Sequence, residues 1–142
     1  PRGCALELPR LSLQCRQKKY NDALKTAARM QRIFSAETDV HFSYGVLQMK
    51  TGHSKEAVTT FYHLVNLYDR MNAQSNVSDN LKTMLVNKAL ALKLLDKPGE
   101  AAAILTKLRD EENDPAVKQY LTMHMARSRE ELIDYMMPGR DM

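Results

Sequence analysis

The sequence has no tryptophan, three phenylalanines, and only five glycines and five prolines among its 142 residues. A β-sandwich needs frequent Gly- and Pro-containing turns between short strands, so this composition argues against that class and suits packed helices. Hydrophobic residues make up 44% of the chain and charged residues 27%. That balance supports a buried core under a soluble surface, and the length predicts a single domain over residues 1–142.

Cysteine is also scarce, because the chain contains only Cys4 and Cys15. Neither stands in a C-x-x-C or zinc-binding spacing, and two cysteines do not make a disulfide framework. Both are expected to be reduced, as in an intracellular, cytoplasmic protein. No apolar run approaches the ~20 residues of a membrane span, and no signal-peptide pattern is present. The chain begins with Pro rather than Met, so we expect a fragment or a processed product, and targeting to an organelle stays open.

Motifs that carry chemistry are missing as well. There is no Gly-rich phosphate loop and no G-x-S-x-G elbow. The acidic run Asp110–Asp114 is interpreted as a solvated helix end rather than as paired catalytic carboxylates. The four histidines lack any metal-ligand spacing; they are His41, His53, His63 and His124. We therefore expect no catalysis, no metal and no cofactor.

The apolar residues recur at intervals of three and four from Tyr20 to Leu108, which predicts helices throughout and no strands. Asp114-Pro115 and Ser128–Glu131 resemble helix starts, the second with the spacing of a capping box. They predict capping helices over about 115–137. Residues 72–80 are polar and are predicted to form a loop, of which only the start extends the preceding helix. The fold class is therefore all-α.

An internal period supports this organisation. Ala57 follows Ala23 by 34 residues, and Ala101 follows Ala57 by 44, which is one such period plus about ten inserted residues. The clearest copy has Gly45 in its first helix, Gly52 at the turn, and Ala57 and Phe61 in its second helix. Helix pairs that repeat every 34 residues are typical of stacked helical arrays.

On these residues the chain resembles the tetratricopeptide repeat (TPR) family. In the third copy Ala89, Ala101 and Leu105 match, whereas in the first copy Ala27 replaces the bulky residue. The Trp that usually stands near each repeat start is absent. The resemblance implies a short right-handed α-solenoid of antiparallel helix pairs, with repeats at about 4–37, 38–71 and 82–113.

The resemblance also implies a function. Such solenoids are protein–protein interaction or scaffold modules, in which the first helix of each pair lines a concave groove that binds a partner helix or an extended peptide. The expected groove is apolar with a few polar anchors; it consists of Phe42, Val46, Met49, Lys50, Val86, Asn87, Leu90 and Lys93. The alternative is that these residues pack against the chain's own C-terminal helices.

Charge is unevenly distributed and leaves a second function open. Residues 1–32 hold eight basic and two acidic residues, a net +6, against +4 for the whole chain. A basic N-terminal third could attract an acidic partner or RNA. The alternative function is therefore an RNA-associated helical-repeat protein, although no repeated polar code for bases is present. A structural subunit buried in a larger complex is a third reading.

Overall fold

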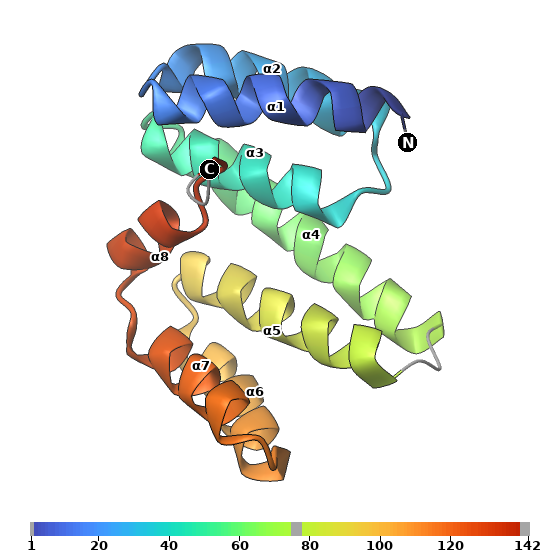
Figure 1. Cartoon of the computed structure of the whole chain (residues 1–142), viewed down its shortest axis with the longest axis vertical. Coiled ribbons are helices and arrows are strands. Elements are labelled where there is room, and N and C mark those ends of the chain that lie inside the picture. Colours follow the sequence, from blue (N-terminus) through green and yellow to red (C-terminus); the bar gives the residue numbers. More distant parts are fainter. Residues whose placement is uncertain (1, 75–77, 140–142) are drawn as a thin grey trace. The chain divides into compact units, whose positions relative to one another are not determined.

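The protein is all-helical, as predicted. A computed structural model describes residues 2–74 and 78–139, and in these ranges it contains eight α-helices and no strand. Figure 1 shows their order along the chain. The helices are α1 (Arg2–Arg16), α2 (Tyr20–Ile33), α3 (Thr38–Lys50), α4 (Ser54–Gln74), α5 (Ser78–Leu94), α6 (Pro98–Glu111), α7 (Pro115–Ala126) and α8 (Arg129–Tyr135). In the described ranges no helix combines the length and hydropathy needed to cross a membrane.

The predicted loop at 72–80 is wrong at both ends. Helix α4 continues to Gln74 and helix α5 begins at Ser78, while residues 75–77 lie outside the described ranges. Residues 71–74 are all exposed. A helical turn that faces water on every side needs no apolar residue, so its polarity was mistaken for that of a loop.

The chain divides into two compact units. Unit 1 comprises the residues up to Phe61 together with those from Ile133 onward, and unit 2 comprises Tyr62–Leu132. Helix α4 contributes its first part to unit 1 and the rest to unit 2.

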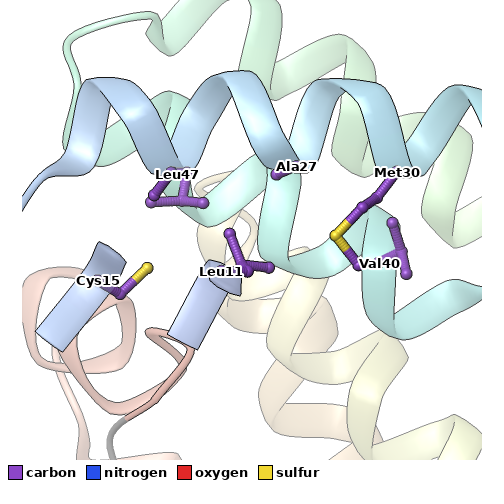
Figure 2. Packing of buried hydrophobic residues seen from close by; sticks show 7 residues of the cluster. Leu11, Cys15, Ala27, Met30, Val40 and Leu47 are labelled. Atoms are coloured by element: carbon purple, nitrogen blue, oxygen red, sulfur yellow. The ribbon is translucent and has the colours of Figure 1, made fainter. Parts of the chain in front are cut away.

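In unit 1, helix α2 packs against both α1 and α3. Figure 2 shows the core that these helices share. The side chains at its centre are fully or almost fully buried; they are Leu11, Cys15, Ala23, Ala27, Met30, Val40 and Leu47. In unit 2, helix α6 packs against both α5 and α7. Each unit is thus built from antiparallel neighbours joined by short turns.

Three of these turns have the same backbone geometry. After α3, the His53 amide donates to the Gln48 carbonyl at 2.7 Å and the Gly52 amide to the Met49 carbonyl at 3.3 Å. This is the Schellman motif, which requires a residue in the left-handed region. Gly52 has a φ of +83°. The same pair of hydrogen bonds closes α1 and α5, with Lys18 (φ 59°) and Asp96 (φ 63°) in the left-handed position. These three residues are 34 and 44 apart, the spacings of Ala23, Ala57 and Ala101.

The buried residues between paired helices follow the same spacing. Gly45 and Phe61 face each other, because a Cβ on Gly45 would lie 2.6 Å from Cζ of Phe61. The equivalent pairs are Leu11 with Ala27 and Ala89 with Leu105, all buried. In the first pair the large residue lies on the first helix and the small one on the second. In the first copy, Ala27 stands where the other two copies have a bulky residue. The bulky residue of this pair is instead Leu11, which stands where the other copies have Gly45 and Ala89.

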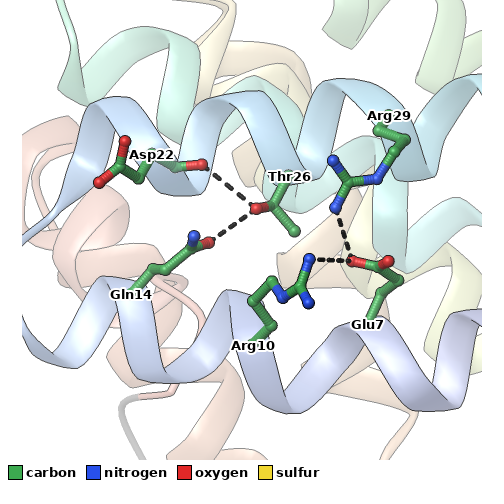
Figure 3. A network of polar contacts seen from close by, with 6 residues as sticks. All are labelled: Glu7, Arg10, Gln14, Asp22, Thr26 and Arg29. Carbon is green, nitrogen blue, oxygen red and sulfur yellow. Dashed lines mark hydrogen bonds and ion pairs between the residues drawn. The ribbon is translucent and has the colours of Figure 1, made fainter.

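A polar contact also recurs. The Thr26 hydroxyl donates to Oε1 of Gln14 at 2.8 Å, and the Thr60 hydroxyl donates to Oε1 of Gln48 at 2.6 Å. Figure 3 shows the first of these contacts between α1 and α2, beside a carboxylate, Glu7, that pairs with two arginines. Both hydrogen bonds join the first helix of a pair to the second. Because each donor and acceptor is satisfied across the helix pair, these contacts fix the register of the pair.

Candidate interaction surfaces

The predicted groove residues of unit 1 divide into buried and accessible ones. Phe42 and Val46 are 4% and 0% exposed. The Phe42 ring meets Phe61 edge to face, with 5.4 Å between ring centroids. Met49 is half-buried and Lys50 is exposed. Phe42 and Val46 are therefore part of the helix packing and do not line an open groove.

Lys50 is engaged by the chain's own C-terminal residues. Its Nζ lies 3.4 Å from Oδ1 of Asp134 and 5.4 Å from the centroid of the Tyr20 ring. Asp134 lies in α8 and belongs to unit 1. On this face of unit 1, the alternative that the chain fills its own groove therefore has direct support.

The predicted groove residues of unit 2 show the same division. Leu90 is 1% exposed, so it is a core residue, and Val86 and Asn87 are half-buried. Lys93 Nζ donates to the carbonyl oxygens of His124 and Met125 at 2.8 and 2.9 Å. These carbonyls lie at the C-terminus of α7, where the helix dipole favours a cation. Burial lowers the pKa of Lys93, and the nearby Arg127 lowers it further while Glu131 opposes both.

Groups capable of chemistry are scattered among the described residues. No three His, Cys, Asp or Glu side chains there lie close enough to hold a metal ion. Burial raises the pKa of the Cys15 thiol to about 11, which leaves it protonated and unreactive at neutral pH. The side chain of Cys4 lies outside those described. Nε2 of His41 lies 2.7 Å from the Ser35 carbonyl oxygen, which ties the start of α3 to the preceding turn.

Helix α7 carries an apolar surface that the sequence analysis did not identify. It starts as predicted, with the Asp114 carboxylate accepting from the Ala116 amide at 2.9 Å and Pro115 in the first turn. Its buried face contains Leu121 and His124. Three apolar side chains on α7 are exposed at successive intervals of three: Val117 at 37%, Tyr120 at 44% and Met123 at 49%. This spacing places them along one side of the helix. We call them the α7 stripe.

The position of Tyr120 is fixed by its neighbours. Its ring meets the His124 ring edge to face at 4.4 Å. The Arg127 guanidinium lies 3.0 Å from Nδ1 of His124, and because arginine only donates, Nδ1 must accept and the ring proton resides on Nε2. Burial lowers the pKa of His124 to about 4, with Arg127 and Lys93 contributing in the same direction. The imidazole is therefore neutral at physiological pH.

A surface hollow of about 330 Å³ lies at the end of the α7 stripe, lined by Met123, Ala126, Arg127 and Glu131. Glu131 belongs to the predicted capping box, which forms. The Ser128 amide donates to Glu131 Oε1 at 3.0 Å, and the Glu131 amide donates to Ser128 Oγ at 3.1 Å. These bonds lower the pKa of Glu131. The spacing of Val117, Tyr120 and Met123 can be read from the sequence, but periodicity alone does not show that solvent rather than protein covers these side chains.

Comparisons of the chain with protein-family models, with curated proteins and with solved structures found no match.

Proposed function

We propose that the protein is a non-catalytic protein-interaction module, built as a short α-solenoid of three TPR-like helix pairs followed by capping helices. Support for the repeat comes from the three Schellman turns at Lys18, Gly52 and Asp96 and from the buried residue pairs at the same spacing. Repeats of this kind present extended surfaces to other proteins. The observation that carries the proposal is the α7 stripe, an exposed apolar surface on a regular helix.

The chemistry around the stripe indicates the kind of partner. Helix α7 contains no acidic residue; Lys118 is exposed, and Arg127 follows at its end. Val117, Tyr120 and Met123 follow one another at intervals of three, so they offer a narrow apolar strip on which the apolar face of an amphipathic helix can lie. Carboxylates beside that apolar face would complement Lys118 and Arg127 and would steer the approach. The proposed partner is therefore an amphipathic helix with an acidic flank, and its apolar anchor fits the hollow beside Met123.

The test replaces apolar surface by charge on two matched sites. Val117→Glu with Met123→Glu alters the α7 stripe, and Val58→Glu with Met71→Glu alters residues of similar exposure, 37% and 40%, on α4. Both variants and the unmodified chain are immobilised, and proteins captured from the native source are compared. The best candidate is then purified and titrated. We expect the α7 variant to weaken binding at least ~10-fold and the α4 variant to leave it unchanged.

Two results would contradict the proposal. Equal capture by the α7 variant and the unmodified chain would exclude the α7 stripe. Equal loss in both variants would indicate nonspecific apolar adhesion. Glutamates at Phe42, Val46 or Leu90 are unsuitable for this test, since a charge at such buried positions would unfold the chain.

The RNA alternative has less support. Two of the N-terminal arginines are occupied, because Glu7 Oε2 lies 2.9 Å from Arg29 and 4.0 Å from Arg10. RNA readers without a base code rely on exposed aromatic rings that stack on bases. Among the described residues the most exposed rings, Tyr62 and Tyr120, lie outside α1 and α2. A salt titration with generic single-stranded RNA tests this alternative, which predicts binding that weakens steeply with salt.

A further inference from the structure

The last described residues of the chain, Asp134–Gly139, lie against the N-terminal helices of unit 1. We call them the C-terminal segment. They belong to unit 1 although more than 70 residues separate them from Phe61, the preceding residue of that unit. Three independent contacts hold them there, and each has a different chemistry.

The first contact is ionic and the second apolar. Asp134 pairs with Lys50 at 3.4 Å, with the carboxylate side chain 71% exposed. An ion pair so exposed contributes little to stability and mainly selects the sign of the charge. Met137 packs on the buried cluster of α1, α2 and α3 that contains Leu11, Cys15 and Leu47. An unbranched side chain suits such a site because it adapts to irregular gaps.

The third contact requires a glycine. A Cβ on Gly139 would lie 2.5 Å from the Ser12 carbonyl oxygen and 3.1 Å from Cγ of Arg16. Gly139 also has a φ of +83°, a conformation that residues with side chains rarely adopt. The backbone of the segment thus approaches the backbone of α1 more closely than any other residue type would allow.

The fit of the C-terminal segment is incomplete. A hollow of about 250 Å³ remains beside it, lined by Cys15, Arg16, Tyr20, Asp134, Met137, Pro138 and Gly139. This hollow is open to solvent, so the C-terminal segment covers only part of the face on which it lies. A segment held by one exposed ion pair, one methionine and one glycine contact is therefore replaceable at a modest free-energy cost.

We propose that the C-terminal segment is an internal ligand of unit 1, and that the face it covers binds the same chemistry when another protein presents it. That ligand is a peptide with a carboxylate, an unbranched apolar side chain three residues later and a glycine two residues after that. Lys50 selects the carboxylate, the cluster around Cys15 takes the apolar side chain, and the Ser12 carbonyl admits only glycine. The C-terminal segment must leave before such a partner enters, so it is autoinhibitory. This site is separate from the α7 stripe and does not depend on it.

Cys15 reports on the state of this face, because the residue is only 4% exposed and belongs to the cluster on which Met137 packs. The experiment uses the full chain with Cys4→Ser, which leaves Cys15 as the single thiol. Gly139→Val releases the segment by steric conflict, and Met137→Ser releases it by loss of apolar contact. Gly99→Val is the matched control, since a Cβ at Gly99 meets nothing within 4 Å. Alkylation of Cys15 by iodoacetamide is followed at pH 8, and circular dichroism verifies that each variant is folded.

We expect both releasing variants to accelerate alkylation at least ~10-fold, since exposure also restores an ordinary thiol pKa, and the control to leave the rate unchanged. A synthetic peptide of Glu130–Gly139 in excess should then return the Gly139→Val rate close to that of the parent. The same peptide with its own Gly139→Val change should not restore that rate.

An unchanged alkylation rate in releasing variants that remain folded would overturn the proposal. So would acceleration that the peptide does not reverse, because the segment would then be structural only. If protection of Cys15 from alkylation required a dimer of the chain, the proposal would also fail, because a second copy and not the chain's own C-terminal segment would cover this face.

Discussion

At Gly45 the absence of a side chain is itself the structural requirement. The Phe61 ring occupies the space where a Cβ would lie, and the same ring is held from the side by Phe42. Phe61 is fully buried, so it cannot rotate away into solvent. A methyl group at Gly45 therefore has to displace a ring that is itself fixed.

We expect Gly45→Ala to destabilise the protein. Alanine gains up to about 1 kcal/mol in helix propensity over glycine, whereas forcing a methyl into a packed core costs about 1–3 kcal/mol. The overpacking dominates in the parent chain. In a Phe61→Leu background the methyl has room, so the same change should be neutral or stabilising. Urea unfolding of the parent, Gly45→Ala, Phe61→Leu and the double variant measures the coupling free energy between the two positions, which we expect to exceed ~1 kcal/mol. If the two effects on the free energy of unfolding were additive, the contact between Gly45 and Phe61 would be contradicted.

At this scale the sequence predicted the small residues correctly but not their partners. Gly45, Ala57 and Ala101 were expected where helices approach closely, and all three are buried. Leu11 was not recognised as the counterpart of Ala27, because a leucine does not resemble the small residues Gly45 and Ala89 at the corresponding positions of the other two pairs. The groove residues Phe42, Val46 and Leu90 were expected to face a partner, but periodicity identifies an apolar face without saying whether protein or solvent covers it.

At the scale of the element, the helix-pair turns are alike in backbone but differ in residue. Gly52 was recognised as a turn because glycine is the usual left-handed residue. Lys18 and Asp96 adopt the same conformation, with φ values of 59° and 63°, although side chains at these positions cost about 1 kcal/mol. The capping signals at Asp114 and Ser128 were confirmed since they act over three residues and need no tertiary contact.

Relief of this local strain should be measurable. We expect Lys18→Gly to stabilise the protein by about 0.5–1 kcal/mol, because the left-handed cost exceeds the extra entropy that glycine loses on folding. Asp96→Gly should gain less, since aspartate tolerates this conformation better. The reciprocal change Gly52→Lys should cost about 1 kcal/mol, and it adds no clash because a Cβ there meets nothing within 4 Å. The measurement is urea unfolding of each variant, in which the midpoint should change while the slope of unfolding free energy against urea concentration stays constant. No gain for Lys18→Gly would show that the turn carries no strain.

At the scale of the whole molecule, we expect the two units to differ in their response to acid. His124 belongs to unit 2, is fully buried and has a pKa lowered to about 4. The unfolded chain takes up a proton near pH 6.5, and the folded chain does so only near pH 4. Between these values the unfolded state binds more protons, so stability falls as pH falls through this window.

We expect unit 2 to lose up to about 3 kcal/mol of stability between pH 6.5 and 4 from this residue, at 1.36 kcal/mol per pKa unit. Native-state hydrogen exchange should therefore show α6 and α7 losing protection before α1 and α2. His124→Gln keeps an acceptor for Arg127 without a titrating group, so it should remove most of the difference. If the exchange of α7 were equally acid-sensitive in that variant, His124 would not be the cause.

The sequence could not predict the division into units. Helical periodicity reports which face of a segment is apolar, but not which distant segment covers it. The return of Met137 and Gly139 to α1 joins residues more than 120 positions apart, and no local signal encodes it. The close approach of Gly139 to the Ser12 carbonyl is visible only in the structure.

The buried helix-pair positions have a consequence for how this fold can change. Leu11 with Ala27, Gly45 with Phe61, and Ala89 with Leu105 divide their volume between the two helices differently in each pair. Each pair combines one large and one small residue. The position on the first helix varies from glycine to leucine, and the position on the second helix varies from alanine to phenylalanine. Substitutions in such a chain would be tolerated as compensated doublets rather than as single exchanges. A profile that scores each position independently would register these pairs as noise.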